Sequence, residues 1–414
     1  ETVLLYYEDP YVKKFEARVL KVIEEKYVVL DRTSFYPEGG GQPADNGVLK
    51  SANGEAEVVD VQMVGNVVVH VVKGKPPSPG ETVSGRIDWG RRMSLMRHHV
   101  ATHMITGAAR RVLGKHAWQA GAQKGVDRSR LDISHWARLT PEQVDRIEEL
   151  ANNVVMENVP IKAVWMPREE AEKRYGYLLY QGGVVPGREI RVVSVGDWDV
   201  EACGGLYPKS TGEVGVIKIV YTERVQDGVE RIVFSAGAPA LRFIQDETAK
   251  VREIAQTLNI PVERVAEETK VIFDEFRKGR REIDRLSKTI AEHEVEKLLE
   301  KSRMIRGVRL ITHVAKDVDA EFLIMVGNKL IDKKPEAIAV LCGVNKTARV
   351  VAMAGKEAIR KGVDAGEIAS EVAGALGGGG GGDASFGQGG GVDVEKTTDA
   401  LKKVHEALKR RLEC

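Results

Sequence analysis

The chain has 414 residues, of which 43% are hydrophobic and 30% charged, and its formal net charge is +1. This length predicts two or three domains, and the near-neutral charge excludes attraction of nucleic acid by the field of the whole protein. Cys203, Cys342 and Cys414 lie far apart without a CxxC pair, which argues against a disulfide framework and favours a reducing compartment. Because no apolar run reaches membrane-spanning length and no signal-peptide pattern opens the chain, we expect a cytoplasmic protein with no membrane partner.

The first ninety residues are predicted to form strands. Runs rich in β-branched residues, separated by polar turns, occur at residues 17–23, 27–30, 56–64 and 67–72. Strands this short and this regularly spaced predict a small β-barrel or sandwich over residues 1–90.

Residues 91–239 combine helices with further strands. Apolar residues recur with helical spacing from Arg91 to Leu113, and a second helix is expected from Pro141 to Glu157 with Thr140 as its N-cap. Strands are expected at residues 161–165, 190–195, 216–221 and 229–234. This pattern predicts an α/β arrangement distinct from the barrel.

Residues 240–304 carry no strand signal. Phe276, Ile283 and Ile290 recur every seven residues among dense charges, with Ile272 and Leu286 at intermediate heptad positions. The spacing predicts a coiled-coil-like linker, and it fits a helix of an intramolecular hairpin as well as an interface between two chains.

The last segment, residues 305–414, alternates in character. A strand at 309–314, a helix at 321–332, a hairpin of strands 338–342 and 348–353, and helices at 356–376 and 394–412 are expected. The glycine tract at 377–391 indicates either a flexible linker or a loop whose backbone closely approaches another group. The predicted fold class is therefore α+β multidomain: a small β-barrel, an α/β domain, a long helical coiled-coil-like linker and a C-terminal mixed α/β domain.

Three side chains have the spacing and chemistry of metal ligands. His99 and His103 are four residues apart on a predicted helix, so they project from one face. Cys203 precedes two glycines, which would leave its sulfur on a tight, open turn. Two imidazoles and one thiolate match a catalytic zinc site with an open position, although a helical histidine pair and a buried thiol are also common in ordinary cores.

A glycine-rich segment lies between two predicted strands. Residues 31–47 include Gly39, Gly40 and Gly41, followed by Gln42 and Asp45. Glycines beside polar side chains let a substrate lie against the backbone, while composition alone also fits a surface loop.

Taken together, these motifs resemble the editing domain of alanyl-tRNA synthetases and of their free-standing relatives. The matching motifs are, in order, 33–42 with 45–47, 97–103, 203–205 with 211–215, and 227–232. The glycine tract resembles the C-terminal domain of the same family, which is shared with DHH-type phosphoesterases. The resemblance is to the archaeal type and extends over essentially the whole chain.

The resemblance implies hydrolysis of serine or glycine wrongly esterified to tRNA(Ala). It implies that Zn2+ is held by His99, His103 and Cys203, that Thr33 recognises the serine hydroxyl, and that Gln42 orients water or the ester carbonyl. Gly40, Gly41 and Asp45 are expected in the substrate-binding loop. A hydroxyl partner in a buried site favours serine over alanine, because alanine would leave it unpaired.

The chain departs from the family pattern after Cys203. The family usually has Cys-Gly-Gly-Thr-His, with the histidine as fourth zinc ligand, whereas this chain has Leu206 and Tyr207. A phenol has a pKa near 10 and binds zinc only after losing its proton. Tyr207 thus leaves open whether water completes the site or zinc is held weakly.

The resemblance also implies tRNA(Ala) as partner and a homodimer formed through residues 240–414. Phosphate contacts are expected from Arg91, Arg92 and Arg97 near the histidine helix. In the C-terminal domain, the expected tRNA contacts are Gly379, Gly380, Gly389, Gly390, Lys402 and Lys403.

Two other functions remain open from the sequence. The first alternative to a deacylase is a tRNA-binding and dimerisation module, in which Tyr207 prevents the site from holding a metal. The second is a phosphoesterase, which is disfavoured because only Asp383 and Asp393 lie near the glycines as candidate metal ligands. No motif of an aminoacylation core is visible, and the first residue is Glu1. We therefore expect the distal half of a synthetase that lacks its aminoacylation domain, with a free-standing editing protein as the alternative.

Overall fold

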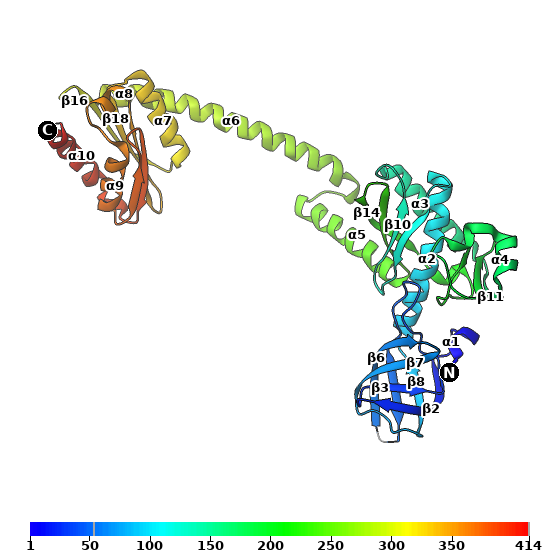
Figure 1. Cartoon of the computed structure of the whole chain (residues 1–414). Helices are drawn as coiled ribbons and strands as arrows, with labels where there is room; N and C mark the ends of the chain where they lie inside the picture. Colours follow the sequence, from blue (N-terminus) through cyan, green and yellow to red (C-terminus); the bar gives the residue numbers. More distant parts are fainter. Residues whose placement is uncertain (53, 413–414) are drawn as a thin grey trace. The chain divides into compact units, whose positions relative to one another are not determined.

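A computed structural model describes residues 1–52 and 54–412; Cys414 lies outside the described residues. The chain divides into two compact units, Glu1–Val262 and Glu263–Cys414 (Figure 1). The predicted multidomain α+β class is confirmed. No described helix is long and apolar enough to cross a membrane.

The N-terminal part of the first unit is a closed six-stranded barrel with the strand order β2-β3-β7-β6-β5-β8. Its strands are β2 (Lys14–Ile23), β3 (Tyr27–Leu30), β5 (Gly47–Ser51), β6 (Gly54–Val64), β7 (Val67–Gly74) and β8 (Thr82–Ile87). Alternate residues of these strands point inward and form the barrel core. A short parallel pair, β1 (Val3–Leu4) with β4 (Arg32–Thr33), and the one-turn helix α1 (Leu5–Glu8) accompany the barrel.

The rest of the first unit is built around α2 (Trp89–Leu113), whose central residues are fully buried. It packs on α3 (Pro141–Glu157), whose predicted capping by Thr140 is confirmed by a capping box with Gln143. A four-stranded sheet has the order β14-β15-β10-β9 and consists of β14 (Ile217–Gln226), β15 (Val229–Ala236), β10 (Ser129–Ser134) and β9 (Gln119–Gln123). The sequence analysis missed β9 and β10, because Gly121, Asp132 and several small or polar residues weaken their strand pattern.

A second, three-stranded sheet carries part of the site. It consists of β11 (Ile161–Pro167), β12 (Glu189–Val195) and β13 (Asp199–Ala202), all antiparallel. The helices α4 (Arg168–Tyr175) and η1 (Gly176–Tyr180) connect β11 to β12, and the single-turn η2 (Thr211–Val214) follows β13. The first unit ends with α5 (Ala238–Leu258).

A short turn, η3 (Val262–Arg264), spans the boundary between the units, and the long helix α6 (Val265–Glu300) follows in the second unit. Only the last turns of α6, with Ala291, Val295 and Leu298, join a core. The predicted heptad residues Phe276, Ile283 and Ile290 are exposed by 64%, 62% and 56% in this chain. Within the described part of the second unit these three side chains therefore join no core, and their stripe is exposed there.

A six-stranded sheet with the order β16-β17-β18-β19-β21-β20 forms the C-terminal domain. Its strands are β16 (Arg303–Ile305), β17 (Val308–Lys316), β18 (Ala337–Val344), β19 (Ala348–Ala354), β20 (Gly379–Gly382) and β21 (Phe386–Gly391). Its helices are α7 (Ala320–Lys333), α8 (Lys356–Arg360), α9 (Ala365–Ala375) and α10 (Thr397–Arg411), the last preceded by η4 (Val394–Lys396).

Two predictions about this domain were wrong. The helix expected over 356–376 breaks between α8 and α9, because Gly362 takes a positive φ of +87° and Asp364 caps the new helix through the N–H of Glu367. The glycine tract is neither linker nor loop but the antiparallel pair β20 and β21. A Cβ at Gly389 would come within 2.7 Å of Ala373 on α9, so glycine lets these strands lie directly on that helix.

Candidate active site

The two histidines of α2 lie side by side in the interior of the first unit. Asp88 caps α2 by accepting the N–H of Arg91, and the helix then carries His99 and His103 one turn apart. Their rings are stacked with centroids 5.7 Å apart, and the two residues are only 1% and 3% exposed. Burial of both imidazoles on one face of the helix makes them available to a common partner.

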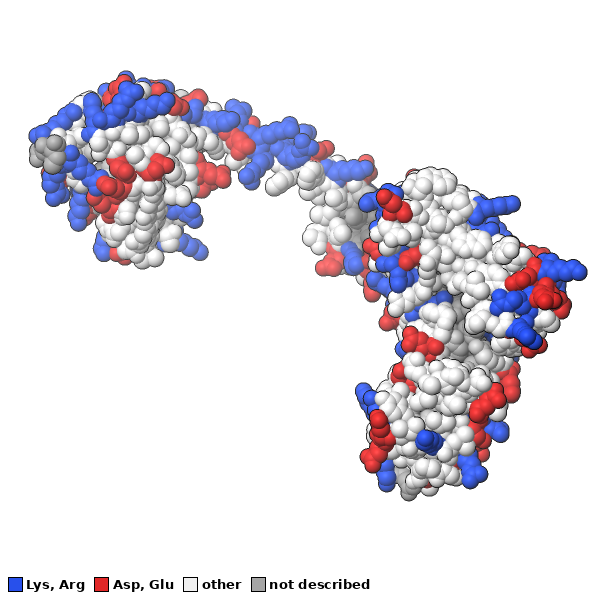
Figure 2. Space-filling model, viewed as in Figure 1, with Lys and Arg blue, Asp and Glu red and all other residues white. Residues whose placement is uncertain are grey.

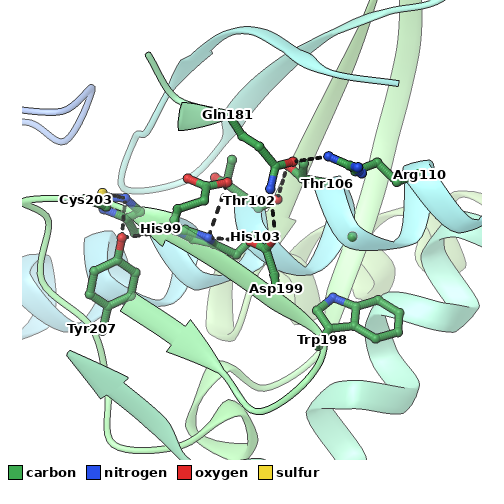
Figure 3. A network of polar contacts seen from close by, with 12 residues as sticks. His99, Thr102, His103, Thr106, Arg110, Gln181, Trp198, Asp199, Cys203 and Tyr207 are labelled. Carbon is green, nitrogen blue, oxygen red and sulfur yellow. Dashed lines mark hydrogen bonds and ion pairs between the residues drawn. The ribbon is translucent and has the colours of Figure 1, made fainter. Parts of the chain in front are cut away.

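Cys203, the residue directly after β13, meets these histidines from a distant part of the chain (Figure 3). Its Sγ lies 3.3 Å from Nε2 of His99, and one ligand atom from each of the three residues lies within 4.8 Å of the others. A Cβ at Gly205 would come 2.0 Å from Cε1 of His99, so only glycine lets the turn after Cys203 pass this close to the ring.

Side chains on the outer side of each imidazole fix which nitrogen carries the hydrogen. Gln42 Oε1 accepts the N–H of Leu206 at 3.2 Å, so this oxygen is oriented as an acceptor. It lies 2.8 Å from Nδ1 of His99 and therefore accepts a hydrogen bond from the N–H at that nitrogen. Asp199 Oδ2 likewise lies 2.8 Å from Nδ1 of His103. Both Nε2 atoms are thereby turned inward, the arrangement by which outer partners prepare histidines as metal ligands.

Tyr207 lies between the two inward-facing nitrogens. Its hydroxyl oxygen is 3.0 Å from Nε2 of His99 and 3.0 Å from Nε2 of His103. The single phenolic hydrogen can be donated to only one of these nitrogens at a time. Burial, reinforced by the negative charge of Cys203, holds the pKa of Tyr207 well above its usual value, so the phenol remains protonated.

Burial and neighbouring charges shift the pKa values of this cluster in opposite directions. Burial alone would raise the pKa of the Cys203 thiol, but the adjacent rings of His99 and His103 lower it well below its usual value. Burial alone would lower the pKa of His103, but the carboxylates of Glu201 and Asp199 raise it. Burial raises the pKa of Glu201 to about 8 and lowers that of His99 to about 4. The thiolate form of Cys203 is therefore the favoured form.

The glycine loop is held against this cluster by Lys124, which follows β9. The N–H of Lys124 donates to the carbonyl of Gly41 at 2.9 Å, and its ammonium donates to the carbonyl of Gly40 at 3.1 Å. Gly41 has a φ of +73°, and a Cβ there would come 2.8 Å from the carbonyl oxygen of Ala122. The loop ends at Gln42, whose Nε2 is buried without a hydrogen-bond partner among the described residues.

The structure places Thr33 differently from the other predicted site residues. Its hydroxyl lies 2.8 Å from Nε2 of His70 and accepts the N–H of Phe35 at 3.0 Å. Nδ1 of His70 in turn donates to the carbonyl of Val28. The contacts of Thr33 thus lie with a barrel histidine, and its role toward a substrate stays a prediction.

Two predicted site residues are engaged with each other, and their roles toward tRNA and substrate stay predictions. Arg92 and Asp45 are both completely buried and form an ion pair with each other, with the guanidinium also donating to the carbonyls of Pro10 and Ser34. Asp45 additionally accepts the N–H of Tyr36. The pair fastens the glycine segment to α2.

The remaining predicted tRNA contacts are accessible. Arg91 and Arg97 are partly buried and donate to the carbonyls of Ala44 and Glu213. Lys402 and Lys403 are exposed on α10. Gly379 and Gly380 are exposed on β20, whereas Gly389 and Gly390 on β21 are partly covered.

The sequence analysis missed Asp199, Glu201 and Lys124. A signal for the first two was present, because Asp199, Glu201 and Cys203 alternate along one extended segment and so share one face. Lys124 gave no such signal, since a single lysine in an unrecognised strand region looks like a solvated residue.

Comparison with known protein families agrees with this arrangement. A model described as tRNA synthetases class II (A) matches residues 6–91, which contain the barrel. The model of the threonyl and alanyl tRNA synthetase second additional domain matches residues 190–233, which include Cys203. The DHHA1 domain matches residues 307–410 of the second unit. Two of these three models describe parts of tRNA synthetases, so the chain is similar to that class of protein in both its barrel and the segment that contains Cys203.

The similar proteins are more specific. The chain is 45% identical over 413 residues to the alanine–tRNA ligase of Pyrococcus abyssi, covering 99% of this chain and 44% of the relative, and 46% identical to that of Thermococcus kodakarensis with the same coverage. The chain is thus similar to these alanine–tRNA ligases over almost its whole length, and it spans less than half the length of these curated relatives. A crystal structure of the C-Ala domain from Aquifex aeolicus alanyl-tRNA synthetase aligns with 28% identity and a TM-score of 0.25, covering 26% of this chain and 97% of that one.

Proposed function

We propose that this chain hydrolyses the ester bond of tRNA(Ala) wrongly charged with serine or glycine, and that it does so with a zinc ion held by His99, His103 and Cys203. The observation that carries the proposal is the convergence of two inward-turned imidazole nitrogens and a thiolate in one buried cluster. This donor set fits zinc, because zinc prefers neutral imidazole and thiolate ligands.

Zinc bound there would supply Lewis-acid polarisation of the ester carbonyl or a water of lowered pKa. The protein groups supply the positioning. Gln42 holds His99 through its amide oxygen and presents an unpaired, buried amide N–H2 that can donate to an oxygen of the ester. Lys124 holds Gly40 and Gly41 in place by hydrogen bonds to their carbonyls. Because glycines have no side chains, the aminoacyl group can lie against the backbone beside this amide.

The second unit is proposed to hold tRNA and to dimerise. On strand β20, Gly379 and Gly381 have no neighbour within 4 Å of the position a Cβ would occupy, so bare backbone faces outward there. Figure 2 shows Lys and Arg side chains in number along α6 and at one edge of the C-terminal unit. Basic side chains and accessible backbone on the same unit suit contacts with phosphates and sugars.

A deacylation assay tests the proposal. Purified chain is given Ser-tRNA(Ala), Gly-tRNA(Ala) and Ala-tRNA(Ala), and the zinc content is measured at protein stoichiometry. We expect cleavage of the first two and sparing of the third, loss of activity with a chelator, and loss in His99→Ala. Binding of tRNA without zinc and without cleavage would instead support a tRNA-binding module, a reading favoured by the phenol of Tyr207 between the two histidines.

A further inference from the structure

A second concave site lies behind His103, on the side of α2 away from the glycine loop residues that contact His99. It is a cavity of about 940 Å³ between the C-terminal half of α2, the sheet β11-β12-β13 and the helices α4 and η1.

Cationic residues outnumber acidic ones in the lining of this cavity. Arg110, Arg111 and Lys115 contribute from α2 and the turn after it, and Lys162 and Arg174 from β11 and α4. In the described part of the chain, Lys115, Lys162 and Arg174 form no ion pair. A concave surface with several uncompensated cations concentrates positive potential and favours an anionic ligand.

The two acidic residues in the lining do not neutralise these charges. Asp197 is exposed. Asp199 is already engaged, since it accepts from Gln181 Nε2 at 3.0 Å and contacts His103. The net charge of the side chains that line the open part of the cavity is therefore positive.

Aromatic rings lie beside the cations. The guanidinium of Arg111 stacks 3.7 Å from the ring centroid of Trp198, and that of Arg174 lies 5.0 Å from the ring of Tyr175. Guanidinium planes and aromatic rings are the surfaces on which unpaired RNA bases stack, and Lys and Arg bind the connecting phosphates. A small inorganic anion would use the charges but not these rings.

The cavity is one side chain away from the candidate active site. Arg110 donates to Gln181 Oε1 at 3.1 Å, Gln181 donates to Asp199, and Asp199 contacts Nδ1 of His103 (Figure 3). Arg110, Gln181 and Asp199 all line the cavity. A strand whose 3′ end carries the ester therefore has a cationic surface within reach of the site.

We infer that this cavity binds phosphodiesters of the tRNA acceptor strand next to the charged 3′ end. The inference rests on the proposed function, since it assumes that the ester on tRNA is the substrate. It adds a binding site on residues that the sequence analysis did not select, and it assigns the positioning of the RNA to Lys162 and Arg174 above all.

The test uses the full chain with the double variant Lys162→Ala/Arg174→Ala. The matched control is Lys21→Ala/Lys73→Ala, which removes two exposed lysines from the barrel strands β2 and β7. Each protein is given Ser-tRNA(Ala) and, separately, the seryl ester of adenosine, which has no phosphate. The affinity for uncharged tRNA(Ala) is measured over a series of salt concentrations.

For the cavity variant we expect kcat/KM on Ser-tRNA(Ala) to fall about tenfold, mainly through KM, with hydrolysis of seryl-adenosine unchanged. The slope of log affinity against log salt should decrease by about 1.4, since each phosphate contact on a single strand contributes about 0.7. The control variant should match the wild type in all three measurements.

Other outcomes distinguish failure of the inference about the cavity from failure of the proposed function. Unchanged kcat/KM and salt slope in the cavity variant, with both substrates cleaved, would overturn the inference and leave the proposed function standing. Equal losses on both substrates would also overturn it, because the side chains would then support the site rather than bind RNA. If wild-type protein cleaves neither substrate, the proposed function fails, and the salt slope alone then decides the inference.

Discussion

Asp199 contacts His103 on the side of the ring opposite Tyr207: Oδ2 lies 2.8 Å from Nδ1, while the hydroxyl of Tyr207 lies 3.0 Å from Nε2. The carboxylate therefore sets the tautomer in which Nε2 can bind a metal. We expect Asp199→Asn to weaken zinc binding about 10- to 100-fold, because an amide can present N–H2 to Nδ1 and stabilise the wrong tautomer. Competition with a colorimetric zinc chelator measures the affinity.

The control for this variant is Asp197→Asn. Asp197 is exposed and two residues away, so its substitution removes the same charge without touching His103. An equal loss of zinc affinity in both variants would mean that general electrostatics, not the contact to His103, is responsible.

Variants of Tyr207 test the fourth ligand position of the same site. Because a phenol must lose a proton before it binds zinc, Tyr207→His should raise the affinity for zinc at least about tenfold by adding a neutral imidazole to the donor set. Tyr207→Phe serves as the matched variant, since it removes only the hydroxyl. Equal zinc affinity in the His and Phe variants would show that position 207 does not face the metal.

Arg92 and Asp45 form the most deeply buried ion pair of the first unit, with both side chains at 0% exposure. Arg92→Met should destabilise this unit by about 3–5 kcal/mol, because it leaves the Asp45 carboxylate buried without a counter-charge. All five tryptophans lie between residues 89 and 198, so urea unfolding followed by tryptophan fluorescence reports on this unit alone.

The double variant Arg92→Met/Asp45→Leu separates the charge from the packing. Removing both partners should restore a substantial part of the lost stability, since no uncompensated charge remains. A double variant as unstable as the single one would assign the loss to packing and to the hydrogen bonds of Arg92 with Pro10 and Ser34.

The sequence predicted the barrel and the histidine helix because each rests on a local pattern, whereas the pairing of the histidines with Cys203 came from ligand chemistry and the family resemblance. The β-branched runs alternate, His99 and His103 share a helical face, and Gly204–Gly205 mark the turn after the thiol. Long-range contacts gave no such pattern. Arg92 looked like a phosphate ligand because its charge is visible in the sequence, whereas its burial opposite Asp45, 47 residues earlier, is not.

The glycine tract is a second case in which a long-range contact, not the local sequence, determines the structure. A run of glycines has low strand propensity, so residues 377–391 were not expected to pair. The helix α9 decides the outcome: its Ala373 and the carbonyl of Ala365 lie where side chains at Gly389 and Gly387 would stand. The close approach was anticipated, but its partner is this chain's own helix.

The open stripe on α6 predicts how the chain associates. Phe276, Ile283 and Ile290 remain exposed at seven-residue spacing, which suits a second helix with the same pattern. We expect a dimer at micromolar concentration and a monomer for Ile283→Lys/Ile290→Lys, measured by sedimentation equilibrium. Lys288→Ala on the same helix is the control. A dimer that survives the double lysine variant would place the interface elsewhere.

His70 gives the first unit a pH-dependent stability that does not involve the metal ligands. Burial lowers its pKa to about 4, so the folded protein keeps it neutral while the unfolded chain takes up a proton below its ordinary value of 6.5. The stability it contributes is complete above pH 6.5 and is lost as the pH falls toward 4, by about 3 kcal/mol in total. His70→Gln, which keeps a polar partner for Thr33, should reduce this loss when unfolding is followed by tryptophan fluorescence at pH 7 and pH 5. An unaltered pH dependence in His70→Gln would mean that other buried groups, not His70, take up the proton.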